Sequence, residues 1–398
     1  MGAQDWEAAT RRPRRVTSAL AAAALLALLG ALALVGLADG NGAPEPSGQD
    51  GPSGIVVEAD PGAEATPEPA PPLVTAEGAR RWEPDAGEPA LDRAGTRSLF
   101  ALDDAGVLHA LRLGSGQRFS SEVGEPWSEL TPQGSGIVLW QPDGPARRLP
   151  STLVEPGTDL GEVARVLPAA RQDSVVLLSV ARDRVVEVAP GGTQRAAHDL
   201  DEPALVLDLA RDGRAMAALG EELATLAPEG AGPDAPLAVE TPLGQGEPLD
   251  ARGGRALWAN CERAACSVDS ARPWASADRV ALAEDGLAVE AIAGTVSPSG
   301  AQVAVSAAGR RDGERVGTAL LHDADGDRLL RLEDLVDPAP RAVAPAWSAD
   351  GRLVAFATAE GLVLVDLAER EAIEVGFPDA AELRALALST TMRWGQGS

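Results

Sequence analysis

The chain has 398 residues, of which 34 are basic and 60 acidic, so its formal net charge is −26. Nucleic-acid binding needs a basic face that neutralises phosphates, and this charge balance opposes it. None of the basic residues is lysine, which excludes Schiff-base enzymes, Walker-type phosphate loops and Ser–Lys dyads.

The N-terminal region predicts a membrane anchor. Four arginines between positions 11 and 15 precede an uncharged, Ala- and Leu-rich run at 16–38. At about 1.5 Å per residue this run is long enough to cross a hydrocarbon layer of about 30 Å. The positive-inside rule then places 1–15 in the cytoplasm and the rest outside, as a single-pass protein of the cell membrane. Gly36–Ala38 would also serve as a signal-peptide cleavage site, in which case the protein is secreted.

Residues 39–94 are expected to form a disordered stalk. Positions 39–77 hold eight carboxylates, eight prolines and no basic residue, a composition too polar and too proline-rich to bury a core. The stalk would hold the folded domain, residues 95–398, away from the membrane.

The folded domain is built from an internal repeat of short apolar runs separated by Gly, Asp and Pro turns, which predicts strands and hairpins. The clearest unit, 342–376, contains four strand-like pieces with a turn at Asp350-Gly351. Comparable turns recur near positions 172, 212, 253 and 299, about 40 to 50 residues apart. This is the period of four-stranded propeller blades.

We therefore predict an all-β fold, a seven-bladed propeller, with six or eight blades as alternatives. The segment 384–391 (RALALSTT) could pair with the first blade and close the ring, which would remove the exposed edges of an open sheet.

Two segments carry a family resemblance, AWSADGRLVAF at 346–356 and LLHDADG at 320–326. In these segments the chain resembles the TolB-type, WD-repeat-like propellers. The resemblance implies a fold and a binding surface, usually for proteins or peptides, and it implies no reaction.

Cys261 and Cys266 are expected at a hairpin tip, where the second and third strands of a blade meet. Outside the membrane such a close pair favours a structural disulfide over free thiols. A redox-active or metal-binding pair would need a two-residue spacing or further ligands.

Asp323, Asp325 and Asp327 alternate along the chain and form a weak calcium candidate. A tightly curled calcium loop needs glycine at its sixth position, where this chain has Arg328, so an ordinary Asp-Gly turn is favoured. The three histidines are scattered and have no zinc-ligand spacing. The sequence therefore predicts no metal and no cofactor.

No nucleophile elbow and no His-Glu-x-x-His motif occurs, and no catalytic residue is predicted. We expect a noncatalytic binding or scaffold module for an envelope protein, a peptide or a wall component. The alternatives are an extracytoplasmic hydrolase with channel-lining carboxylates and a cation or small-molecule sensor. A hydrolase should gather carboxylates with perturbed pKa values at one mouth of the channel, whereas a scaffold should expose an apolar or aromatic patch on one face.

Overall fold

A computed structural model describes ten segments of the chain: 79–82, 97–124, 127–150, 157–171, 173–230, 235–262, 265–282, 286–323, 326–376 and 382–389. The predicted cytoplasmic tail, the anchor at 16–38 and most of the stalk lie outside these segments. Within them, no helix has the length and apolar character needed to span a bilayer.

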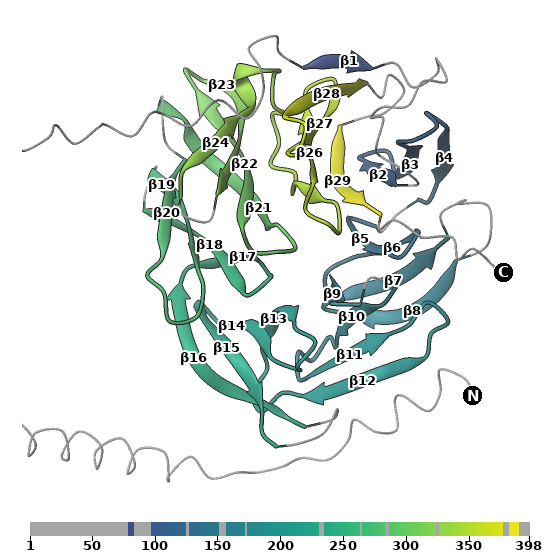
Figure 1. Cartoon of the computed structure of the whole chain (residues 1–398), viewed down its shortest axis with the longest axis vertical. Coiled ribbons are helices and arrows are strands. Elements are labelled where there is room, and N and C mark those ends of the chain that lie inside the picture. The colour runs from purple at the N-terminus through teal and green to yellow at the C-terminus, as the bar shows by residue number, and fades with distance from the viewer. Residues whose placement is uncertain are drawn as a thin grey trace, which may run out of the picture. The chain divides into compact units, whose positions relative to one another are not determined.

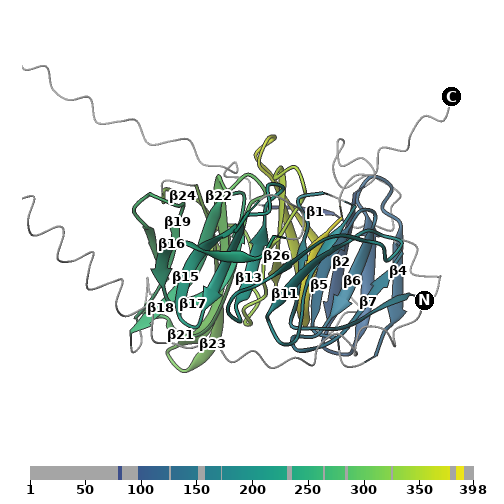
Figure 2. The same cartoon turned by 90° about the horizontal axis from the view of Figure 1, so that it is seen from below.

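Seven antiparallel sheets stand in a ring around a central axis (Figure 1). The prediction of a seven-bladed propeller is confirmed. Each blade has four antiparallel strands, and one fifth strand is added at the rim of blade 7. Figure 2 shows the ring from the side, with the sheets next to one another.

From the channel outward, blade 1 consists of β29 (Leu383–Leu388), β2 (Ser98–Asp103), β3 (Val107–Arg112) and β4 (Arg118–Glu122). Blade 2 consists of β5 (Glu129–Gln133), β6 (Gly136–Trp140), β7 (Gly144–Leu149) and β8 (Thr158–Val163), and blade 3 of β9 (Arg165–Pro168), β10 (Val175–Leu178), β11 (Arg184–Val188) and β12 (Gln194–Asp199). Blade 4 consists of β13 (Leu205–Leu209), β14 (Ala215–Leu219), β15 (Glu222–Pro228) and β16 (Leu237–Gln245).

In the same order, blade 5 consists of β17 (Glu247–Arg252), β18 (Arg255–Glu262), β19 (Ala265–Ala271) and β20 (Asp278–Ala281). Blade 6 consists of β21 (Ala288–Val296), β22 (Gln302–Arg311), β23 (Glu314–Asp323) and β24 (Arg328–Arg331). Blade 7 consists of β25 (Ala346–Trp347), β26 (Leu353–Thr358), β27 (Gly361–Asp366) and β28 (Glu371–Gly376). A 3-10 turn, η5 (Leu332–Asp334), follows β24.

The strand order gives the ring two distinct faces. Because neighbouring strands of a blade are antiparallel, the turns from the first strand to the second and from the third to the fourth share one face. We call it the mouth face. The repeated turns near 212, 253, 299 and 350 are all first-to-second turns, so the pattern found in the sequence marks this face.

The hydrophobic core has seven main layers, one between each pair of neighbouring blades. A smaller eighth cluster on blade 3 is formed by Val186, Val188 and Ala197. Alternate residues of a strand face opposite neighbours. In β2, Phe100 and Leu102 pack toward blade 2, whereas Leu99 and Ala101 pack toward blade 7. Each blade thus has two apolar faces and can bury them only against its neighbours.

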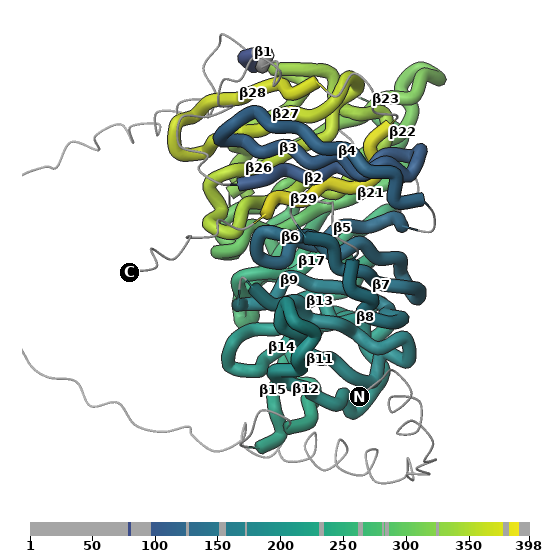
Figure 3. The backbone as a smooth tube through the Cα atoms, turned by 90° about the vertical axis from the view of Figure 1, so that its right-hand side faces the viewer, coloured from purple at the N-terminus to yellow at the C-terminus, as the bar shows by residue number. Residues whose placement is uncertain are grey.

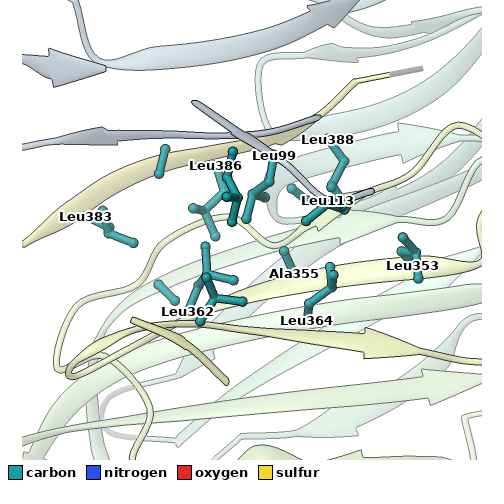
Figure 4. Packing of buried hydrophobic residues seen from close by; sticks show 14 of the residues in the cluster. Leu99, Leu113, Leu353, Ala355, Leu362, Leu364, Leu383, Leu386 and Leu388 are labelled. Carbon is teal, nitrogen blue, oxygen red and sulfur yellow. The ribbon is translucent and has the colours of Figure 1, made fainter. Parts of the chain in front are cut away.

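The ring closes where the C-terminal strand β29 joins blade 1. β29 pairs with β2, with Leu388 opposite Leu99, and Figure 3 shows the two strands side by side. The backbone N–H of Ser389 donates to the carbonyl of Ser98 at 2.8 Å. In Figure 4, side chains of this closing blade face those of blade 7 across the layer, among them Leu386 and Leu362. The predicted closure by the segment beginning at Arg384 is confirmed.

The fifth strand of blade 7 comes from the N-terminal side of the domain. β1 (Arg80–Trp82) runs parallel to β28, and Arg80 Nε lies 3.0 Å from Glu371 Oε1. These three residues fall within 39–94, where the sequence predicts a disordered stalk, and here they form a strand instead. The outer edge of β28 offers unpaired backbone groups that an extended segment can bind.

Two turns of the mouth face touch each other through glycines. Gly300 has φ +69°, and a Cβ atom placed on it would lie 2.5 Å from the carbonyl oxygen of Gly253. The turns of blades 5 and 6 can approach this closely only because neither residue has a side chain.

We expect Gly300→Ala to lower the free energy of unfolding by at least about 1 kcal/mol more than Gly192→Ala. Gly192 is the matched control, because it also has a positive φ (+78°) but no atom within 4 Å of its added Cβ. Urea denaturation of the two variants measures the difference. Equal losses would show that the two turns are not in close contact.

Candidate binding site at the channel mouth

A cavity of about 430 Å³ lies where the first strands end at the mouth face. All seven blades contribute to its wall, which places the cavity on the central axis of the ring. The wall is mainly apolar, with polar atoms from Ser174, Asp208, Arg211 and Arg252. Its other lining residues are Pro132, Pro168, Ala169, Ala170, Leu209, Ala210, Gly253, Gly254, Pro298, Trp347, Ala349 and Leu388.

The first strands of blades 2 to 5 carry five charged residues that act on one another, and we call them the channel cluster: Glu129, Arg165, Asp208, Asp250 and Arg252. Asp208 and Arg252 line the cavity. Arg165 Nη2 donates to the carbonyl of Leu249 at 3.2 Å, so blade 3 is linked directly to blade 5. The backbone N–H of Val296 donates to Asp250 Oδ2 at 2.8 Å, which links blade 5 to blade 6.

Burial and mutual charge shift the pKa values of this channel cluster. Burial raises the pKa of Asp208 to about 7, the negative charge of Asp250 adds to the rise, and Arg252 opposes it. Burial also raises the pKa of Asp250, against a backbone hydrogen bond and two arginines. The pKa of Glu129 is raised by burial as well, although the charge of Arg165 lowers it.

All five side chains keep some surface accessible to water, yet protein surrounds the channel that they line. The charges therefore face a medium of low polarity even where a water molecule can reach them. The same burial lowers the pKa values of Arg165 and Arg252.

Ser174 is the hydroxyl residue of the cavity wall, and its partners are not those of a nucleophile. Its hydroxyl oxygen accepts from Arg195 Nη1 at 2.6 Å, and its Oγ lies 3.4 Å from Asp173 Oδ1. A nucleophilic serine instead bonds to a general base. The acid–base chemistry that the cavity offers therefore rests on Asp208.

An exposed tryptophan lies on the same face of the ring. Trp274, in the turn between β19 and β20, is 83% exposed and has a positive φ of 69°. Arg272 Nη2 donates to the carbonyl of Gly300 at 3.2 Å, and Gly300 packs against Gly253 of the cavity wall. The loop that presents this aromatic ring is thus fixed to the rim of the cavity.

The other predicted residues lie away from the cavity. Cys261 and Cys266 face each other in the β18–β19 hairpin and form a disulfide, as predicted, on the face opposite the mouth. Asp323 Oδ1 accepts the backbone N–H of Asp327 at 2.9 Å, as in an Asp-Gly turn. Asp325 lies outside the described residues. Within the described segments no three His, Cys, Asp or Glu residues gather in a way that could hold a metal ion.

The histidines belong to three different blades, and all are buried. His109 lies between Asp103 Oδ2 and Ser120 Oγ, at 3.1 Å from each, an arrangement that sequence analysis missed. Asp103 Oδ1 also accepts the backbone N–H of Val107 at 2.8 Å. These bonds join three adjacent strands and fix the turn between β2 and β3.

Comparison with protein families and with curated proteins finds no match to this sequence. Solved structures similar to it include a protein from Lactobacillus plantarum (13% identity, TM-score 0.45, 74% of this chain and 99% of the other). A putative 6-phosphogluconolactonase from Bacteroides fragilis has 12% identity, TM-score 0.44, and coverage of 76% and 99%.

TolB from Acinetobacter baumannii is also among the similar structures, at 14% identity and TM-score 0.38, over 74% of this chain and 67% of TolB. At such identities these likenesses concern the fold alone, so the role of the cavity depends on the residues of this chain.

The raised pKa of Asp208 makes a testable contribution to stability. Between about pH 4 and pH 7 the native state holds a proton on Asp208 that the unfolded state has lost, so stability falls as pH rises. Asp208→Asn removes this effect. We expect the free energy of unfolding of Asp208→Asn, minus that of wild type, to increase by about 2 to 4 kcal/mol from pH 4 to pH 8.

Urea denaturation across this pH range measures the change, with Asp212→Asn as the control. Asp212 is exposed in the next turn, and the asparagine can still accept the Arg214 N–H. If the two variants follow the same pH dependence, Asp208 is not the buried acid described above.

Proposed function

We propose that this protein is a membrane-tethered, extracytoplasmic binding module that holds a partner from the cell envelope at its mouth face. The partner would be a protein segment, a peptide or a wall component. The observation that carries the proposal is the cavity to which all seven blades contribute. A rigid ring can present such a site without paying much ordering entropy on binding.

Two further features support the choice of face and compartment. Trp274 is exposed on the mouth face, and tryptophan is enriched among residues that dominate binding energy. The disulfide between Cys261 and Cys266 suits an oxidising compartment outside the cytoplasm. The arginine-flanked run at 16–38 would supply the tether.

The test is photo-crosslinking in native membranes, with the crosslinking residue placed at position 210 or, as the control, at position 180. Ala210 lines the cavity, whereas Val180 is 43% exposed in a turn between β10 and β11 on the opposite face. We expect a defined envelope partner to be captured from position 210 and not from position 180. Capture from position 180 alone would contradict the proposal.

We also expect Trp274→Ala to lower the yield of the crosslink from position 210 severalfold, because loss of an exposed aromatic anchor typically weakens binding by more than about 1 kcal/mol. The substitution removes an exposed side chain, so thermal unfolding should be unchanged. An unchanged yield would exclude Trp274 from the binding surface.

The second candidate is a hydrolase, favoured by one observation. A carboxyl group with a pKa of about 7 can act as a general acid at neutral pH. Incubation of the protein with wall polymers tests this directly. Turnover that is lost in Asp208→Asn, without capture of any partner from position 210, would replace the binding proposal with an enzymatic one.

A further inference from the structure

The channel cluster contains one more acid than it has bases. Glu129, Asp208 and Asp250 are the carboxylates, and Arg165 and Arg252 are the guanidinium groups. Each arginine is shared between two acids: Arg165 is attracted by Asp250 and Glu129, and Arg252 by Asp250 and Asp208. With every group ionised, the cluster lacks one positive charge.

The excess negative charge of the cluster lies nearest the cavity at Asp208. Of the three acids, only Asp208 lines the cavity wall. Asp208 and Asp250 each have a backbone hydrogen bond, from Leu209 and Val296 respectively. Around Asp208 the wall is apolar, with Leu209, Pro168 and Trp347 among its members. The wall also includes Arg211 and Arg252, and Arg252 is already attracted by both Asp250 and Asp208. A largely apolar pocket with one acid in its wall suits an aliphatic stem that ends in a positive charge.

We propose that the cavity receives an organic cation, a primary ammonium group on an aliphatic stem such as a lysine side chain of the partner, with Asp208 as its counter-ion. This inference rests on the proposed function and names the part of the partner that enters the mouth. A calcium ion is a poorer match, because it needs six to eight oxygen ligands and no three His, Cys, Asp or Glu side chains of the described segments are placed to hold a metal ion together.

Arg211 does not neutralise Asp208 inside the cavity. It is exposed at the rim, where Nη2 donates to the carbonyl of Ala170 at 3.2 Å. An exposed guanidinium is screened by solvent and repels a bound cation only weakly. The main chain of the partner can therefore pass the rim while its ammonium group reaches Asp208.

In the free protein below about pH 7 a proton takes the place of the missing cation, since the pKa of Asp208 is about 7. Binding of an ammonium group must displace this proton, so affinity should rise with pH up to about pH 8 and a proton should be released on binding. The charged groups that face Asp208 are those of Asp250 and Arg252 on β17, Arg211 in its own turn, and, farther along the channel, Glu129 and Arg165.

The experiment titrates the full-length chain in detergent with the capped peptides Ac-Ala-Lys-Ala-NH2, Ac-Ala-Nle-Ala-NH2 and Ac-Ala-Glu-Ala-NH2, using isothermal calorimetry. Norleucine has the same stem as lysine without the ammonium group. At about pH 8 we expect the lysyl peptide to bind at least about tenfold more tightly than the norleucyl peptide. In Asp208→Asn this preference should fall to about twofold or less, and in Asp212→Asn it should persist.

Four results would overturn the inference. The first three are equal binding of the lysyl and norleucyl peptides, a lysine preference that survives in Asp208→Asn, and no lysyl binding up to about 10 mM. Tightest binding of the glutamyl peptide would likewise overturn the inference, because it would show that Arg211 and Arg252 determine the charge of the ligand that the cavity binds. If any of these occurs while position 210 still captures an envelope partner, the binding module stands and only the organic cation is wrong. If capture fails as well, both proposals fall.

Discussion

The pairing of β29 with β2 is the constraint on which the rest of the structure depends. Each blade has two apolar faces, and each face is buried only against a neighbouring blade. A ring of such blades has no free apolar face, whereas an open arc would expose one at each end and leave sheet edges unpaired. The last strand of the chain therefore completes the burial of the first blade and, through it, of all seven.

Closure also creates the electrostatic character of the channel. Side chains on the first strands face protein on every side once the ring is complete, which is why Asp208, Asp250 and Glu129 hold their protons more tightly than exposed acids do. Arg165 and Arg252 make the burial of these acids tolerable, and the hydrogen bonds to Leu249 and Val296 fix the cluster to neighbouring blades. The site is thus a property of the ring and not of one blade.

The repeat made the fold predictable from the sequence. Turns such as Asp350-Gly351 and Ser299-Gly300 set the period, and the apolar segment after Arg384 indicated the closing strand. β1 was missed because its pairing depends on the free edge of β28, which no local pattern reports.

The channel cluster was harder to predict, because an acidic chain contains many carboxylates that carry no signal. A usable signal existed in the repeat itself. Asp208 and Asp250 each interrupt an apolar first strand just before its turn, in LVLDLARDG and PLDARGG. Charges at that place in a blade face the channel, but Glu129 and Arg165 belong to weaker repeats whose first strands could not be aligned.

The most direct test of the central role of ring closure is thermal unfolding of two truncated chains, one ending at Ser389 and the other at Gly376. The first keeps β29 and should unfold cooperatively within about 3 °C of the full chain. The second lacks β29 and should lose cooperative unfolding and aggregate, because blades 1, 2 and 7 are left with exposed apolar faces. A chain ending at Gly376 that unfolds cooperatively at the same temperature as the full chain would contradict this account.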